Sequence, residues 1–270
     1  MTTNITALPT YFISHGGGPW PWVPKMREMF ANLETSLKDM VAEWDTPPKA
    51  ILMVSGHWEG AQVEVMATQR PPMIYDYNNF PKETYEVVYP AKGAPEFARR
   101  ALELLVDAGF DAKLNLEQGY DHGVFVPMHV MYPEADIPLF QVSILSSYDP
   151  KEHFALGRAL SALRKEGVMI IGSGLSYHNL QRLGPEAAEP SAAFDAWLND
   201  VMQMLPQDRT AQLEAWENAP RARICHPEED HLVPLFVALG AAEDEPAATV
   251  YHEPDMMGSI AASGFRFGAV

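Results

Sequence analysis

The segment TYFISHGGGP (10–19) decides the expected fold, because an apolar run ends there in a histidine and a glycine-rich loop. The same order occurs in AILMVSGHW (50–58) and in VMIIGSGLSYH (168–178). Short apolar or β-branched runs of this kind are typical of buried strands. Longer amphipathic stretches separate them. This alternation predicts an α/β sheet with helices packed on it.

The remaining chain extends the same pattern. The expected strands are residues 10–14, 50–55, 62–68, 138–145, 168–172, 248–252 and 265–270. The expected helices are residues 25–44, 94–108, 150–166, 191–205, 209–218 and 230–239. No internal repeat or low-complexity segment divides the chain. We therefore predict a single domain over residues 1–270, in which helices flank a central, mostly parallel mixed sheet.

The composition narrows the choice of partners. The chain has 36 acidic and 19 basic residues, a formal net charge of −17. A field of this sign repels phosphate backbones and anionic lipids, so we expect neither nucleic acid nor membrane partners. Cys225 is the only cysteine, which excludes an internal disulfide and a thiolate-rich zinc site. The start MTTNITALPT lacks signal-peptide features, which predicts a cytoplasmic protein. Whether the chain forms a homo-oligomer stays open.

Histidines stand where the expected strands end. His15, His57 and His178 each follow an apolar run and a glycine or serine, and His122 precedes an apolar run that indicates a short helix. In open α/β sheets the carboxyl ends of the strands converge on one crevice, where ligands bind. Neutral imidazole is a good ligand for borderline divalent metals. The sequence therefore predicts a metal site at this edge of the sheet.

A further histidine lies in HPEEDHL (226–232). Asp230 is a preferred residue at a helix start, so we expect it to cap a helix that carries His231 in its first turn. The alternative is an acidic, solvated helix start without a functional role. For His153 and His252 we expect structural roles, and for His129 either packing or a place behind the metal ligands.

Five blocks together resemble a known family. They are YFISHGGGP (11–19), ILMVSGHW (51–58), YDHGVFVPMHVMYPEADIPLFQVSI (120–144), IIGSGLSYHNL (170–180) and HPEEDHLVPLFVALGAA (226–242). In this order they are similar to the class III, LigB-like extradiol ring-cleaving dioxygenases. Within that superfamily the resemblance is closest to the DODA type, the 4,5-DOPA dioxygenase extradiol-like proteins.

The resemblance implies one divalent metal per chain, with Fe(II) expected for activity and Zn(II) as the alternative. Carried over block by block, the metal ligands are His15, His57 and His231. His178 matches the catalytic base of the family. His122 matches a histidine that orients the substrate or dioxygen. The implied reactants are a small catechol and O2, and the implied product is a ring-opened semialdehyde.

Two points of the resemblance stay open. Protocatechuate-type relatives use a glutamate as third ligand, so Glu228 and Glu229 remain alternatives to His231. Trp58, Tyr120 and Tyr177 flank the histidines and are expected to bind the substrate, although such aromatic residues also pack in cores.

Two other functions compete with ring cleavage. A three-histidine site also suits a zinc hydrolase that uses metal-bound water as its nucleophile. The superfamily also includes Memo-like proteins, in which oxygenase activity is not the evident role, so a metal-binding interaction protein is the second alternative.

Overall fold

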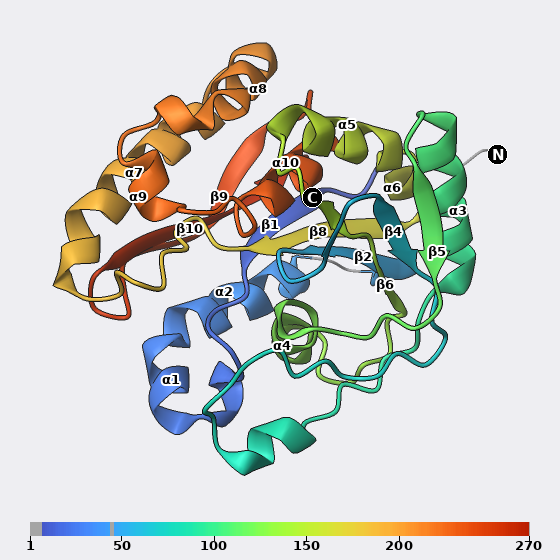
Figure 1. Ribbon diagram of the computed structural model, residues 1–270, viewed down its shortest axis with the longest axis horizontal. Coiled ribbons are helices and arrows are strands. Elements are labelled where there is room, and N and C mark those ends of the chain that lie inside the picture. The colour runs from blue at the N-terminus through green and yellow to red at the C-terminus, as the bar shows by residue number, and fades with distance from the viewer. Residues whose placement is uncertain (1–6, 44–45, 270) are drawn as a thin grey trace.

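A six-stranded mixed sheet lies at the centre of the fold (Figure 1). The computed structural model describes residues 7–43 and 46–269. In order across the sheet, the strands are β6 (Leu139–Gln141), β2 (Ala50–Ser55), β8 (Val168–Gly174), β1 (Thr10–Ser14), β10 (Ile260–Phe267) and β9 (Ala247–Met256). The first four run parallel to one another, and β10 and β9 add two antiparallel pairings.

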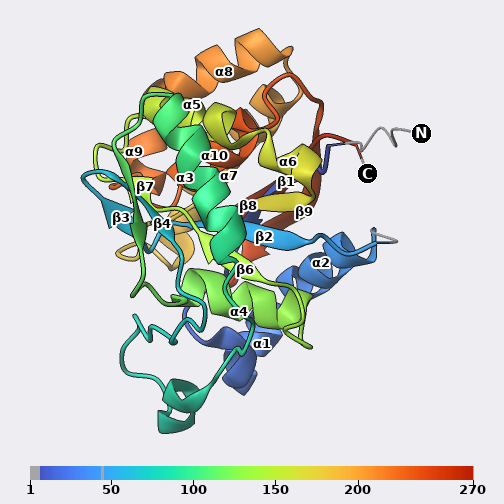
Figure 2. The same cartoon turned by 90° about the vertical axis from the view of Figure 1, so that its right-hand side faces the viewer.

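Helices cover both faces of this sheet (Figure 2). On one face α10 (Val233–Gly240) packs against β1, β2 and β8, and α5 (Pro150–Leu160) packs on α10. On the other face lie α2 (Ala31–Ala42) and α4 (His122–Met131). Every residue of β1, β2 and β8 is buried, which explains why these strands are almost continuously apolar in the sequence.

The other elements surround this core. The remaining α-helices are α1 (Pro24–Met29), α3 (Pro95–Asp107), α6 (Leu163–Glu166), α7 (Ala188–Met202), α8 (Pro206–Glu214) and α9 (Ala222–Cys225). The 3-10 helices are η1 (Trp20–Trp22), η2 (Lys82–Glu86), η3 (Pro185–Ala187) and η4 (Trp216–Asn218). Two small parallel sheets pair β3 (Glu59–Gly60) with β7 (Ile144–Leu145) and β4 (Val63–Met66) with β5 (Ala112–Asn115). Among the described residues, no helix has the length and apolar character needed to cross a membrane.

The predicted fold class is confirmed, and the bounds of β1 and β2 agree with the sequence patterns. The expected helix 25–44 is divided at Phe30, which has a non-helical backbone and a buried ring. The end of that prediction, Trp44, and the end of the last expected strand, Val270, lie outside the described residues. The expected strand 138–145 is two short strands, β6 and β7, which belong to different sheets.

The predicted helix start at Asp230 is wrong. The helix α10 begins at Val233, with a proline in its first turn, and Asp230 and His231 lie in the turn before it. The carboxylate of Asp230 does not cap the helix, because it accepts a hydrogen bond from the ring of His231 at 2.7 Å. A side chain that could cap a helix here serves a histidine instead.

Two glycines of β8 bring this turn onto the sheet. A Cβ atom on Gly174 would lie 2.1 Å from the carbonyl oxygen of His231, and one on Gly172 would lie 2.2 Å from that of Pro234. The amide of Leu175 donates to the same His231 carbonyl at 3.0 Å. Only a residue without a side chain permits this approach, so the glycines of β8 fix the position of His231.

We expect Gly174→Ala to lower the free energy of unfolding by about 1–3 kcal/mol, because the added methyl group overpacks a closed contact. It should also lower the metal content, since the backbone of His231 must move. Urea denaturation and metal analysis measure the two effects. The control is Gly17→Ala, whose Cβ would meet no atom closer than 3.7 Å. Parental stability and metal content in Gly174→Ala would contradict this account of β8.

Candidate metal centre

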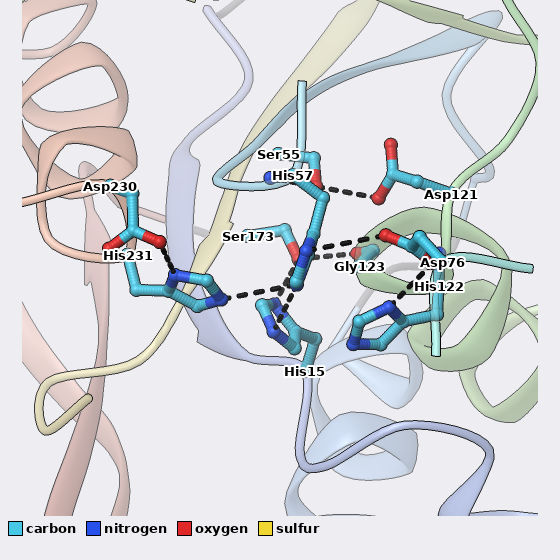
Figure 3. A network of polar contacts seen from close by, with 10 residues as sticks. All are labelled: His15, Ser55, His57, Asp76, Asp121, His122, Gly123, Ser173, Asp230 and His231. Atoms are coloured by element: carbon cyan, nitrogen blue, oxygen red, sulfur yellow. Dashed lines mark hydrogen bonds and ion pairs between the residues drawn. The ribbon is translucent and has the colours of Figure 1, made fainter. Parts of the chain in front are cut away.

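Three histidine rings meet at the carboxyl edge of the sheet (Figure 3). His15 follows β1 directly and His57 follows β2 after one glycine, so the parallel strands bring them together. The Nε2 atoms of His15 and His57 lie 3.2 Å apart, and those of His57 and His231 lie 3.1 Å apart. The strand ends and the turn before α10 therefore bring the Nε2 atoms of His15 and His231 to 3.2 and 3.1 Å from that of His57.

Hydrogen bonds on the far side of the His15 ring determine which of its nitrogens carries the proton. The hydroxyl of Ser173 donates its hydrogen to the carbonyl of Gly123. It can therefore only accept from His15, whose Nδ1 lies 3.1 Å away. A neutral imidazole that donates from Nδ1 has a lone pair at Nε2.

Carboxylates hold the other two rings in the same tautomer. The Nδ1 of His231 donates to Asp230 at 2.7 Å, and the Nδ1 of His57 lies 3.3 Å from an oxygen of Asp76. Both Nε2 atoms then carry lone pairs, as in His15. Without a proton or a cation between them, lone pairs at 3.1–3.2 Å repel one another. The donor set therefore calls for a cation.

The spacing suits one metal ion. Zinc–nitrogen bonds measure about 2.0–2.1 Å, so two nitrogens on one ion lie about 2.8–3.4 Å apart at octahedral to tetrahedral angles. The observed separations of 3.2 and 3.1 Å fall within this range.

Burial keeps these rings neutral. Burial lowers the pKa of His15 well below its ordinary value, and the neighbouring histidines lower it further. The same two causes strongly lower the pKa of His57. In His231, burial and the neighbouring histidines lower the pKa to about 4, although the hydrogen bond to Asp230 acts in the opposite direction. Neutral imidazole is the form that binds a metal, so the site needs no proton release near pH 7.

Two more histidines flank the three rings. The Nδ1 of His122 donates to Asp76 at 2.7 Å, so that Asp76 contacts His122 through one oxygen and His57 through the other. On the opposite side, the ring of His178 stacks on that of His231 with centroids 3.4 Å apart. Its Nδ1 lies 3.4 Å from Asp230. Each carboxylate thus joins one of the three converging rings to one flanking ring.

The charge of Asp230 is stabilised by its two histidines. Burial alone would raise the pKa of this carboxyl, but its contacts with His178 and His231 outweigh burial and lower the pKa. An ionised Asp230 can keep a proton on the Nδ1 of each ring.

Other combinations of neighbouring side chains could also supply ligands for a metal. The described residues contain two groups with ligand atoms within 4.8 Å of one another: His15, His57 and His122, and His178, Asp230 and His231. The 3.1 Å contact between His57 and His231 joins the two groups. The shortest nitrogen contacts favour His15, His57 and His231 as the ligand set, with His122 and His178 beside it.

A cavity of about 380 Å³ opens onto these rings. All five histidines line it, as does Tyr177, one of the three predicted aromatic residues. Trp58 and Tyr120 do not line it. Tyr120 is fully buried and its hydroxyl faces backbone carbonyls at 3.3–3.4 Å, and Trp58 is 8% exposed in the core. The structure thus gives these two residues a packing role, which the sequence had left as the alternative.

Other residues of the cavity were not predicted from the sequence. Asp76, Tyr77 and Phe80 all line it and belong to YDYNNF (75–80), a stretch without regular secondary structure. The only signal was an acidic residue between two tyrosines. A loop without periodicity gives no indication of the direction in which that acid points.

The remaining acids and histidines have other partners. Glu229 pairs with Arg223 at 2.6 Å, and Glu228 is exposed. Both nitrogens of His153 are used by backbone groups, and His252 contacts Ser263, so these two histidines fit the expected structural roles. His129 packs against Trp22 with ring centroids 4.8 Å apart.

Known proteins of similar sequence have names from ring-cleavage chemistry. The family model described as the catalytic LigB subunit of aromatic ring-opening dioxygenase matches residues 9–267. Dioxygenase tasH of Hapsidospora irregularis is 36% identical over 262 residues, with coverage of 90% of this chain and 81% of that protein. The 4,5-DOPA dioxygenase extradiol of Beta vulgaris is 36% identical, with 96% coverage of both chains.

A solved structure shares the fold. The crystal structure of the uncharacterized protein JW3007 from Escherichia coli K12 matches with a TM-score of 0.78 and 28% identity. The match covers 97% of this chain and 100% of that one.

We expect His231→Ala to lose most of its metal affinity, because one of three converging nitrogens disappears. Glu228→Gln and Glu229→Gln should bind metal nearly as the parent does, since Glu228 is exposed and Glu229 pairs with Arg223. Metal titration of the three purified variants measures this. Normal binding by His231→Ala, together with loss in either glutamine variant, would make a carboxylate the third ligand.

We expect Asp76→Asn to weaken metal binding by about 10–100-fold, the usual effect of removing a carboxylate that orients a ligating histidine. The control is Asp107→Asn, the same chemical change at an exposed position on α3. Competition with a chelator of known affinity gives the dissociation constants. Equal affinities in both variants would show that Asp76 does not orient His57.

Proposed function

Since this chain belongs to the LigB family of extradiol ring-cleaving dioxygenases, we propose that it cleaves a small catechol with O2 at a metal held by His15, His57 and His231. The observation that carries this proposal is the contact of the His57 Nε2 atom with the Nε2 atoms of both His15 and His231, in a cavity that His122 and His178 also line. The enzymes of this family depend on a metal and act on an aromatic substrate with O2.

We propose Fe(II) as the active metal. Three neutral imidazoles bind either iron or zinc, so the ligand set alone favours neither. When bound, Fe(II) supplies positions for both substrates and the redox chemistry that O2 requires, whereas zinc has no redox chemistry. The neutral rings and their carboxylate partners hold the ligand nitrogens ready for either ion.

His178 is the proposed general base. Its Nδ1 faces Asp230 and its ring lines the cavity, so the other ring nitrogen is available to take a phenolic proton. The charge of Asp230 stabilises the imidazolium that results. Because the ring stacks on His231, its orientation is fixed before the substrate arrives.

His122 is the proposed orienting residue on the opposite side. Asp76 holds its Nδ1 at 2.7 Å, which leaves Nε2 to contact an oxygen of the substrate or dioxygen. Tyr177 contributes an aromatic wall, and its hydroxyl is occupied by the carbonyl of Arg182 at 2.7 Å. His178 and His122 would thus contact a bound substrate from opposite sides.

We also propose a domain organisation and a cellular location for the chain. We propose that residues 1–270 form one domain, because β1 near one end pairs with β10 near the other and the family model spans residues 9–267. A cytoplasmic location is supported by Cys225, which is buried and free. No specific observation favours a zinc hydrolase or a Memo-like interaction protein.

Oxygen uptake tests the proposed reaction. Protein freed of metal and reconstituted anaerobically with Fe(II) should consume O2 with catechols and form a yellow ring-fission product. The same protein loaded with Zn(II) should consume none. Uptake by neither form with any catechol would contradict the proposal.

We expect His178→Ala to lower kcat by about 10²–10⁴-fold while most of the metal stays bound, because a general base but no metal ligand is lost. The control is His252→Ala, the same change at a half-exposed histidine on β9. Rates and metal content of the two iron-loaded variants measure this. Loss of metal from His178→Ala, with activity restored by excess Fe(II), would make His178 a ligand.

A further inference from the structure

The cavity beyond the histidines is apolar. Its outer wall includes Met26, Phe30, Phe80, Met256 and Ile260. A cavity of about 150 Å³ already admits benzene, so the volume of about 380 Å³ leaves room for a ring substituent. Such a substituent would lie against methionine, phenylalanine and isoleucine side chains, which favour apolar groups.

The polar groups of the wall already have partners. The hydroxyl of Tyr77 donates to the carbonyl of Thr84 at 2.6 Å, and that of Tyr177 donates to the carbonyl of Arg182. Asn179 donates to the carbonyl of Ile224 and accepts from a backbone amide. Asp76 gives one oxygen to each of two histidines. Apart from the second hydrogen of the Asn179 amide, none of these groups has a donor left for a carboxylate.

No lysine or arginine lines the cavity in the part of the chain that the structure describes. A carboxylate that enters without a cation loses its hydration and gains no charged partner of opposite sign, which is costly. The rim adds nothing to attract it, since Leu180 and Leu183 at the mouth are 70% and 37% exposed. Arg182 lies between them in the chain, but its side chain is exposed and does not line the cavity.

We infer that the substrate is a catechol with an uncharged, apolar ring substituent, and that catechols bearing a carboxylate are disfavoured. This inference rests on the proposed ring cleavage. It separates the chain from relatives named for DOPA, an amino acid that carries both a carboxylate and an ammonium group. The specificity-determining feature is the lack of a lysine or arginine side chain in the described lining of the cavity.

A matched pair of substrates tests the inference. The acid 3-(3,4-dihydroxyphenyl)propionate and its methyl ester share ring and chain and differ by one charge. With the iron-loaded enzyme, we expect kcat/KM from oxygen uptake to be at least about tenfold higher for the ester. An acid that is cleaved as efficiently as the ester, or better, overturns the inference.

Three variants locate the cause of the preference. Leu183→Arg places a cation at the rim and should raise kcat/KM for the acid relative to the ester by about tenfold, whereas Leu183→Gln, which is uncharged, should leave the ratio unchanged. Arg182→Gln should also leave the ratio unchanged. A selective loss of acid cleavage in Arg182→Gln would show that this arginine recognises carboxylates, and would overturn the inference.

Unsubstituted catechol and 4-methylcatechol distinguish a wrong substrate preference from a wrong proposed reaction. Oxygen uptake with these compounds, combined with preference for the acid, overturns the inference and leaves ring cleavage intact. No uptake with any catechol overturns the proposed function, and the inference falls with it.

Discussion

The structure of the site depends on one constraint: the Nε2 lone pair of His57 faces those of His15 and His231 at 3.2 and 3.1 Å. Each ring is held in this tautomer by an acceptor at Nδ1, which is Ser173 for His15, Asp76 for His57 and Asp230 for His231. The arrangement is unfavourable until a cation satisfies the lone pairs, because burial also disfavours protonation of the rings. The buried parallel strands and the close contact of β8 with the turn before α10 stabilise the fold and offset this repulsion between the lone pairs.

The two carboxylates give the centre its organisation. Asp76 connects His57 to His122, and Asp230 connects His231 to His178. One carboxylate therefore connects the proposed ligand His57 to the proposed orienting residue His122. The other connects the proposed ligand His231 to the proposed base His178. Groups that share an acceptor in this way are restrained together, which is how a site is held ready before its substrate binds. Figure 3 shows Asp230 with His231 on one side of His15 and Asp76 with His122 on the other.

The sequence predicted the strands and histidine positions that follow from the pattern of apolar residues. Apolar runs ending in glycine and histidine located β1 and β2, and parallel strand ends converge, so His15 and His57 could be placed together. Two features could not be predicted. Asp230 is equally suited to cap a helix or to accept from a ring, and only tertiary contacts decide between the two. Asp76 lies in an irregular loop 46 residues before His122 in the sequence. No sequence pattern in such a loop predicts where its side chain points.

The position of the bound metal is the most direct test of the proposed ligand set. Anomalous X-ray diffraction from crystals of the iron- or zinc-loaded protein locates the ion directly. We predict one peak per chain, about 2.0–2.2 Å from the Nε2 atoms of His15, His57 and His231. A peak bonded to His122 or His178, or to an oxygen of Asp76 or Asp230 in place of one of these nitrogens, would contradict it.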